Sequence, residues 1–511
     1  MIVLFNESCN PPERTLGVYR IATVLRNQGL EVEVIDFISK WKFHKLMEYV
    51  KSIENVDWYG FSTKFLEPGK ISIKSILTAN PEFQETQEKN SAQGNGLFTK
   101  LSGHHEDELV DWIKQQNKPI VLGGPNADVI RHMTDKLDVV CLGYSDNAIL
   151  AVHDHLTKQA PLIYENYNNM KVVDADKDYP VNDLGNLETW YADTDFVEEG
   201  EVFPIEISRG CIFHCAFCEY RHLGKKPGTY IRSKESIKRD IVYRYEKFGS
   251  TKFLFLDDTF NDSIEKMQMI KEIRDETGIP FEFWSYGRLD LLAAQPDQVN
   301  LIPEIGWKEF TFGVETFNRV SGKAVGKGAD PEKLKKFLLD LKARFPDIRM
   351  QINIIVGLPH DTEQSVRETV DWFIENSHIT QNFRITNLSI RNPEGRLFAS
   401  KIAQDPEKYG YKIIGINQQT RLLRWETENL NIKSSKKLVE ELRVKIHQSI
   451  SSKYENRNFI GLMSDEPRYT ENADGRLINL REDITKTYIV KKLQYRGLSS
   501  STNLKEKENN A

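Results

Sequence analysis

Residues 203–218 read Phe203-Pro-Ile-Glu-Ile-Ser208-Arg-Gly210-Cys211-Ile-Phe-His-Cys215-Ala-Phe-Cys218, an apolar run followed at once by three closely spaced cysteines. The run up to Ser208 predicts a β-strand, and Gly210 predicts the turn that ends it. Cys211, Cys215 and Cys218 then lie on one short loop at the end of that strand. The spacing C-x3-C-x2-C therefore predicts a metal centre on this loop.

The order of strand followed by helix repeats after this loop. Further strands are expected at 252–256, 281–285, 309–314, 350–356 and 383–390. The intervening helices have clear beginnings at Ser233, at Thr362 and at Asp330-Pro331, where a capping carboxylate precedes a proline. Six such units predict a partial barrel of parallel strands, because a full eight-stranded barrel usually needs more chain.

The residues before the cysteine loop predict a separate α/β domain. Strands are expected at 2–5, 32–35, 58–62, 120–122 and 139–142, with a helix at 17–28. This alternation is typical of an open, mainly parallel sheet wrapped by helices. The expected domains are 1–160 with a polar insertion at 80–108, a linker at 161–200, the barrel at 201–398, a mainly helical region at 399–498 and a disordered tail at 499–511.

Composition excludes several classes of protein. Lys and Arg total 69 against 75 Asp and Glu, a net charge of −6, so no global basic field exists to hold a nucleic acid. No apolar run is long enough to span a bilayer, and the first residues lack the pattern of a signal peptide. Five cysteines are too few for a disulfide scaffold of this length. The cytoplasm is the expected compartment, with no membrane or nucleic-acid partner.

Three thiolates on one loop can bind three irons of a cubane cluster and leave the fourth iron without a protein ligand. An open metal position admits a substrate, as it does in catalytic zinc sites. The amino and carboxylate groups of S-adenosylmethionine (SAM) fit such a position. The alternative is a structural zinc site completed by His214 or His222, but zinc sites usually pair C-x2-C knuckles from two segments, and no second knuckle is present.

The cysteine motif, with Phe217 before its last cysteine, resembles that of the radical SAM enzymes over about residues 200–395. The resemblance implies a [4Fe–4S] cluster on Cys211, Cys215 and Cys218 within a partial TIM barrel. It also implies reductive cleavage of SAM to a 5′-deoxyadenosyl radical, with electrons from a donor such as flavodoxin or ferredoxin. The rival reading is a non-catalytic iron–sulfur or zinc-binding protein. The methylthiotransferases of the family are disfavoured, because they carry further N-terminal cysteines, and only Cys9 and Cys141 are available here.

The same resemblance suggests residues that contact SAM at the ends of the later strands. Asp257 or Asp258 would accept hydrogen bonds from its amino group, although a helix-capping aspartate is the alternative. The resemblance places Glu315 at the ribose hydroxyls and Gly357 in the region that contacts adenine. Ser285 and Arg288 would pair with the carboxylate, or else make an ordinary hydrogen bond and surface salt bridge.

The N-terminal domain resembles the cobalamin-binding domains that precede some radical SAM enzymes. Ser62, Thr63, Gly123 and Gly124 are the residues expected at a cobalamin, although paired glycines after a strand also occur in plain turns. The Asp-x-His-x-x-Gly motif of such domains is absent, and the loop reads Asn-Glu-Ser-Cys-Asn-Pro-Pro at 6–12. Either cobalamin binds without a lower ligand from the protein, or only the fold has been kept. With cobalamin the expected reaction is C-methylation, and without it another radical modification, of a substrate that no motif identifies.

Overall fold

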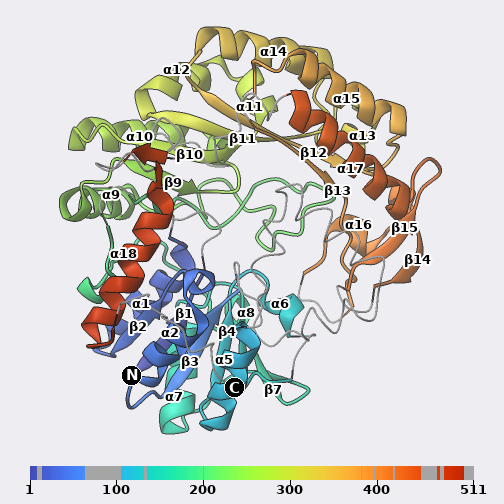
Figure 1. Cartoon of the computed structure of the whole chain (residues 1–511). Coiled ribbons are helices and arrows are strands. Elements are labelled where there is room, and N and C mark those ends of the chain that lie inside the picture. The colour runs from blue at the N-terminus through green and yellow to red at the C-terminus, as the bar shows by residue number, and fades with distance from the viewer. Residues whose placement is uncertain are drawn as a thin grey trace, which may run out of the picture. The chain divides into compact units, whose positions relative to one another are not determined.

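The computed structural model describes residues 1–7, 14–63, 105–131, 135–198, 201–380, 382–394, 398–417, 421–449, 469–471 and 477–499. The chain forms two compact units (Figure 1). The first comprises Met1–Asn182, Glu188–Glu201 and Tyr469–Ala511, and the second comprises Asp183–Leu187 and Val202–Arg468. Cys9, most of the expected insertion at 80–108 and all but the first residue of the expected tail at 499–511 lie outside the described residues.

The first unit is built on a seven-stranded sheet of order β2-β1-β3-β4-β5-β7-β6. Its strands are β1 (Ile2–Phe5), β2 (Val32–Ile35), β3 (Trp58–Ser62), β4 (Ile120–Gly123), β5 (Val139–Leu142), β6 (Glu165–Tyr167) and β7 (Met170–Asp174). Its helices in the first part of the chain are α1 (Leu16–Arg26), α2 (Phe43–Lys51), α5 (His105–Gln115), α6 (Ala127–Ile130), α7 (Ala148–Lys158) and α8 (Ala175–Asp178), with 3-10 turns η1 (Ile38–Lys40) and η2 (Asp193–Asp195). The first five strands fall where the sequence predicted them.

The sheet is mainly parallel, as predicted, with one antiparallel edge pair between β6 and β7. The expected linker at 161–200 is instead largely part of the first unit, since Met170, Val172 and Val173 of β7 are buried beside β5. A three-residue strand and a five-residue strand carry too short an apolar pattern to be recognised in a polar stretch.

The C-terminal residues also divide between the units rather than forming one helical domain at 399–498. The strands β16 (Tyr469–Glu471) and β17 (Leu477–Asn479) and the helix α18 (Leu480–Tyr495) belong to the first unit. There the Tyr488 hydroxyl donates to the carbonyl oxygen of Val34 at 3.1 Å and accepts from the Asp36 backbone N–H at 2.8 Å. The buried Lys492 forms an ion pair with Glu33 of β2. Helix α18 therefore completes the core of the N-terminal sheet.

The second unit contains six parallel strands in the order β13-β12-β11-β10-β9-β8, which confirms the predicted partial barrel. The strands are β8 (Phe203–Glu206), β9 (Lys252–Leu256), β10 (Glu282–Gly287), β11 (Trp307–Glu315), β12 (Arg349–Val356) and β13 (Asn382–Asn387). The helical elements between them are α9 (Lys234–Phe248), η3 (Phe260–Asp262), α10 (Ile264–Thr277), α11 (Leu289–Ala294), α12 (Pro296–Ile305), α13 (Arg319–Ala324), α14 (Pro331–Arg344) and α15 (Glu363–Glu375). Figure 1 shows these helices along the outer side of the curved sheet.

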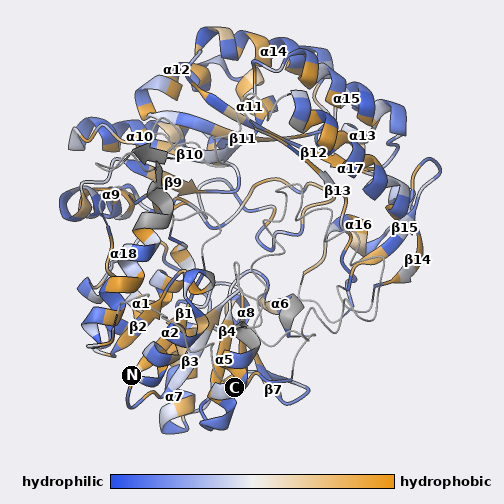
Figure 2. Cartoon of the chain, viewed as in Figure 1, coloured by the Kyte–Doolittle hydropathy of each residue, from blue (hydrophilic) through white to orange (hydrophobic). Residues whose placement is uncertain are grey.

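Local chemistry explains where the barrel helices begin. The Ser233 and Thr362 hydroxyls each accept a backbone N–H of the following first turn, and Asp330 accepts two. Helix α14 then buries Leu334, Leu338 and Leu341 on one stripe, whereas the rest of its surface is mainly polar (Figure 2). These helices therefore pack on the sheet through a single apolar face.

The second unit ends in a small extension. It contains α16 (Lys401–Gln404), η4 (Glu407–Tyr409), the hairpin strands β14 (Lys412–Ile416) and β15 (Leu423–Glu426), and α17 (Ile432–Ser449). The hairpin is a further departure from the helical region expected there. Its Trp425 and the nearby Tyr411 are buried with Leu358 in one apolar cluster, beneath the loop that follows β12. Among the helices of the described residues, none has the length and apolar composition needed to cross a bilayer.

Candidate metal centre

The three motif cysteines lie on a compact loop directly after β8. The Cys211 backbone N–H donates to the carbonyl oxygen of His222 at 2.9 Å, and the Cys211 carbonyl accepts from Lys225 at 3.0 Å. Within the motif, the Cys218 N–H donates to the Cys215 carbonyl at 3.0 Å. The loop therefore folds back on itself, and its shape is fixed by backbone hydrogen bonds.

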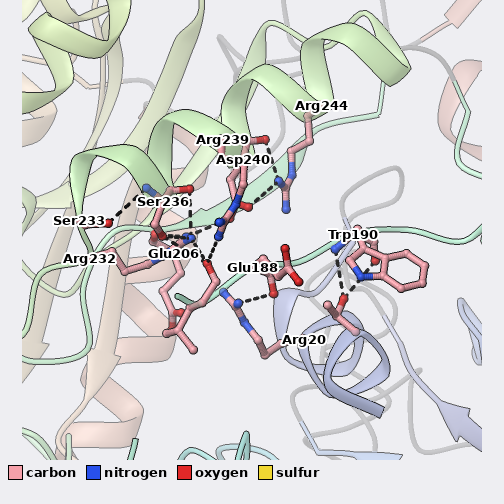
Figure 3. Close-up of polar contacts among 12 residues, drawn as sticks. Arg20, Glu188, Trp190, Glu206, Arg232, Ser233, Ser236, Arg239, Asp240 and Arg244 are labelled. Atoms are coloured by element: carbon pink, nitrogen blue, oxygen red, sulfur yellow. Dashed lines mark hydrogen bonds and ion pairs between the residues drawn. The ribbon is translucent and has the colours of Figure 1, made fainter. Parts of the chain in front are cut away.

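Arg232 fixes the end of β8 from which this loop departs (Figure 3). Its Nη1 donates to the carbonyl oxygen of Glu206 and to the carboxylate of Asp240, both at 2.9 Å. Its backbone N–H donates to the Ile207 carbonyl at 2.9 Å. Both Arg232 and Asp240 are buried, so this charge pair joins α9 to the strand end without contact with water.

Each cysteine sulfur has at least one polar neighbour. Cys211 Sγ lies 3.5 Å from Thr259 Oγ1, and Cys218 Sγ accepts the Tyr220 N–H at 3.4 Å. Cys215 Sγ accepts from Arg288 Nη1 at 3.7 Å. Hydrogen bonds to ligating sulfurs are a means by which proteins tune iron–sulfur clusters.

Burial disfavours ionisation of these thiols when no metal is bound. It raises the pKa of Cys218 to about 12, and the neighbouring Cys215 adds to that rise. It also raises the pKa of Cys211, against the effect of the hydrogen bond with Thr259. A coordinated metal deprotonates its thiol ligands outright, so metal binding here is coupled to proton release.

The donor set fits a cluster better than a single ion. Among the residues that the structure describes, no three His, Cys, Asp or Glu side chains converge on one metal ion. The His214 ring packs against Gly224, where a Cβ would overlap it, and the His222 ring contacts the Tyr220 ring with centroids 5.7 Å apart. The zinc alternative with either histidine therefore finds no support. In a cubane each thiolate binds a different iron, which suits three thiols that do not converge on one ion.

The two aspartates after β9 have different environments. The Asp257 carboxylate is buried, bonded to Lys266 Nζ at 2.8 Å and to the Thr259 N–H at 2.9 Å. The neighbouring Asp258 is exposed, and its charge raises the pKa values of the Cys211 and Cys218 thiols. The Asp257 carboxylate is thus engaged in contacts that stabilise the fold, whereas Asp258 lies beside the cysteines.

Ser285 and Arg288 also differ: Ser285 makes its contact within the fold, whereas Arg288 lies beside a motif cysteine. Ser285 is fully buried, and its hydroxyl donates to the Phe255 carbonyl oxygen at 2.9 Å. Arg288 stands beside Cys215 and forms a bidentate pair with Asp290, at 2.9 Å and 2.5 Å. The salt-bridge alternative for Arg288 is present, although this salt bridge is largely buried.

Glu315 ends β11 in a strained conformation. Its φ of 67° is left-handed, and the strand register shifts between Gly313 and Glu315. A Cβ on Gly313 would overlap the Glu315 carboxylate, which accounts for glycine there. Burial raises the pKa of Glu315, whereas Lys327, with its Nζ 3.6 Å away, and Arg288 act to lower it. Backbone strain of this kind is concentrated at functional sites.

Gly357 and Phe217 lie against the apolar cluster around Trp425. Gly357 has a φ of +90°, and a Cβ there would overlap the Trp425 ring. Its carbonyl oxygen accepts from the Tyr411 hydroxyl at 2.7 Å, and Phe217 packs against the same cluster. The loop after β12 therefore requires glycine for its conformation and for this close packing.

In the first unit, the four residues expected at a cobalamin come together at the carboxyl ends of β3 and β4. Ser62 pairs in register with Gly123, and the Thr63 N–H donates to the Gly123 carbonyl at 2.8 Å. Gly124 has a φ of +101°, and a Cβ on it would come 2.9 Å from Thr63 Oγ1. The turn thus needs Gly124 for its own structure. It borders the edge at which the order β2-β1-β3 reverses, where open α/β sheets bind ligands.

Sequence reasoning missed Thr259 and Lys327. Thr259 directly follows the two aspartates, where its hydroxyl contact to Cys211 depends on a distant part of the chain. Lys327 belongs to a Gly-Lys-Gly stretch at 326–328 and donates to the Gly313 carbonyl at 2.7 Å. That stretch is the only signal that could have drawn attention to it.

Comparisons with known proteins found similarity in the region that contains this loop. Residues 205–373 match the family model described as "Radical SAM superfamily". The ribosomal protein uS12 methylthiotransferase RimO of Thermotoga petrophila is 28% identical over 178 residues, which are 34% of this chain and 41% of RimO. The chain thus spans about two fifths of the length of this curated relative.

Two solved structures share the fold over most of the chain. The radical SAM methyltransferase TsrM from Kitasatospora setae, with cobalamin and a [4Fe–4S] cluster bound, gives a TM-score of 0.56 at 16% identity over 81% of each chain. The cobalamin-dependent SAM radical enzyme OxsB, with aqua-cobalamin and SAM bound, gives 0.54 at 14% identity over 98% of this chain and 73% of OxsB. At these identities the likeness concerns the fold. The match to the radical SAM superfamily therefore concerns residues 205–373, which include the cysteine loop, and the solved structures show a shared fold.

Proposed function

We propose that this enzyme holds a [4Fe–4S] cluster on Cys211, Cys215 and Cys218, cleaves SAM reductively, and methylates a carbon of its substrate with the help of cobalamin. The observation that carries the proposal is a loop of three thiols fixed by backbone hydrogen bonds, each with a polar neighbour. The cluster would supply the electron that breaks the C–S bond of SAM. Flavodoxin or ferredoxin in the cytoplasm is the proposed reductant.

The protein's own side chains would bind and orient SAM. Asp258, exposed beside the thiols, would accept hydrogen bonds from the amino group of SAM. Glu315 would accept from the ribose hydroxyls, since its strained backbone holds the carboxylate beside Lys327. The backbone at Gly357 would contact adenine. Asp257 and Ser285 are left out of this proposal because both are occupied by contacts within the fold.

Cobalamin would bind at the carboxyl edge of the first unit's sheet. Gly123 has open space where a Cβ would stand, and Ser62 lies opposite it in the neighbouring strand. The edge also borders the point of strand-order reversal. Bound cobalamin would carry the methyl group to be transferred. Without the Asp-x-His-x-x-Gly motif, the chain offers no conventional histidine beneath the cobalt, so binding without a protein lower ligand is proposed.

Methylthiolation is less well supported, despite the similarity to RimO. That similarity covers 34% of this chain. A second cluster would need three further cysteines before the barrel, where the sequence has Cys9 and Cys141. Cys141 lies in the centre of the sheet, 1% exposed on β5. Methyl transfer therefore accounts better for the residues present.

Iron content and SAM cleavage test the cluster. Anaerobically reconstituted protein should bind about four irons per chain and release 5′-deoxyadenosine when reduced with dithionite. Cys215→Ala should lose both properties. Cys141→Ala is the matched control, because its thiol is buried within the sheet of the first unit, and it should retain both. One zinc per chain, or no SAM cleavage by a protein with four irons, would contradict the proposal.

Isotope transfer tests the methylation. Protein produced with cobalamin supplied should co-purify with a cobalamin absorbance spectrum, and incubation with SAM deuterated at its methyl group should label a small-molecule or peptide product from cell extract. Gly123→Phe would fill the open space at the strand edge and should reduce cobalamin content while leaving four irons in place. Cobalamin-free protein that still transfers the label would refute the role of cobalamin.

A further inference from the structure

Arg288 is the one charged hydrogen-bond donor to a motif sulfur among the contacts that the structure describes. Its Nη1 lies 3.7 Å from Cys215 Sγ, whereas the Thr259 hydroxyl beside Cys211 and the Tyr220 N–H that donates to Cys218 are neutral groups. The side chain is 7% exposed, so water screens this charge poorly. Of the three contacts, this one carries a full positive charge.

Four further contacts hold the guanidinium in one position. It lies over the Phe213 ring, 3.9 Å from the ring centroid. It pairs with both carboxylate oxygens of Asp290, and Nη2 donates to the Gly326 carbonyl oxygen at 3.3 Å. A guanidinium fixed on several sides makes a lasting contact with the sulfur, not an occasional one.

This arrangement bears on the alternative role of Arg288 as a partner of the SAM carboxylate. Asp290 already occupies the fork of the guanidinium, with one oxygen on Nε and one on Nη2. A SAM carboxylate would have to displace Asp290 to make a bidentate pair there. The nitrogen that Asp290 leaves is Nη1, and it faces the sulfur.

We infer that Arg288 raises the reduction potential of the cluster by acting through Cys215, and that Asp290 limits this effect by neutralising part of its charge. Reduction adds one negative charge to the cluster. A nearby positive N–H donor stabilises the reduced form more than the oxidised form. The inference rests on the cluster of the proposed function but adds a residue that sets how readily it is reduced.

Two substitutions of opposite sign test the inference. Arg288→Met keeps an unbranched side chain against Phe213 but removes the charge, so the equilibrium constant for reduction should fall about tenfold, which is about 59 mV for one electron. Asp290→Asn leaves the guanidinium without its counter-charge and should shift the potential upward. Asp340→Asn, in the exposed pair Lys336–Asp340 on α14, removes a comparable charge far from any sulfur and should change nothing.

The measurement is a redox titration of the reconstituted cluster, followed by its electron paramagnetic resonance signal, without SAM or substrate. A merely structural role of Arg288 would alter iron content but not produce opposite shifts in the two variants. If Arg288→Met loses the cluster, the upward shift of Asp290→Asn still decides the question. Unchanged potentials in variants with four irons would overturn the inference alone, and a wild-type chain without a cluster would refute the proposed function as well.

Discussion

Replacing each aspartate after β9 by asparagine should separate stability from SAM binding. Asp257 is fully buried with Lys266, and Lys266 also contacts Asp262 at 2.7 Å. Removing one partner of a lone buried ion pair costs about 3–5 kcal/mol. Asp262 remains beside Lys266 in Asp257→Asn, so the expected loss is smaller, about 2 kcal/mol, the value of a hydrogen bond to a charged group. Asp258 is exposed, and Asp258→Asn should alter stability by less than about 0.5 kcal/mol.

For SAM binding we expect the opposite pattern, with the larger effect from Asp258→Asn. Asp258→Asn removes a charge-assisted hydrogen bond to the SAM amino group, so the Kd for SAM should rise about tenfold, equivalent to about 1.4 kcal/mol. Asp257→Asn should leave that Kd near the wild-type value in the protein that remains folded. Urea unfolding of the apoprotein followed by tryptophan fluorescence measures the first effect, and equilibrium dialysis of reconstituted protein with labelled SAM measures the second. An unfolding midpoint lowered by Asp258→Asn, or SAM affinity lost only in Asp257→Asn, would refute the division of roles.

Three further predictions follow from single contacts. Gly313→Ala should raise the KM for SAM in the 5′-deoxyadenosine assay several-fold, because the added Cβ displaces the Glu315 carboxylate; an unchanged KM would count against the ribose contact. Burial raises the pKa of Asp361 to about 7, so the folded state holds this proton more tightly than the unfolded state, whose pKa is near 3.9. The free energy of unfolding should therefore fall as pH rises from about 4 to about 7, by up to about 1.4 kcal/mol per pH unit, and Asp361→Asn should lose that slope in parallel urea titrations. Lys492→Met should destabilise the first unit by about 3 kcal/mol or more, since it leaves Glu33 buried without its counter-charge, and a Tm equal to that of wild type would show that α18 contributes little.

Elements with strong local signals could be predicted from the sequence. The barrel strands carry apolar runs, and the helices between them begin at Ser233, Asp330 and Thr362, whose side chains do cap the first turns. The added strands β6 and β7 could not be predicted, because they are short and gain their stability from pairing with an existing sheet edge. Helix α18 lies in the region expected to be mainly helical, but its place on the first unit depends on contacts such as that of Tyr488 with Val34, far apart in sequence.

The three cysteines could be proposed as ligands from their spacing alone, because three thiols on one loop are a local feature. The polar residues around the cysteines could not be assigned in this way. Asp257 and Asp258 are adjacent and chemically identical, and the difference between them lies in Lys266, which comes from the following helix. Ser285 was expected at the cofactor, yet its hydroxyl donates to a backbone carbonyl of the neighbouring strand β9. A sequence motif shows which residue types are present at a strand end, but not which of them are already bonded within the fold.

The parallel order of the barrel explains why the polar neighbours of the sulfurs come from separate segments. The carboxyl ends of adjacent parallel strands meet at one edge, so each strand–helix unit can contribute one group there. Tyr220 follows β8, Thr259 follows β9 and Arg288 follows β10, and they contact Cys218, Cys211 and Cys215 respectively. Because each donor is held by its own loop, the loss of one should leave the other two in place. The charged donor after β10 should therefore adjust the potential of the cluster without determining whether the cluster binds. This separation allows the redox titration to distinguish tuning by Arg288 from a general structural role.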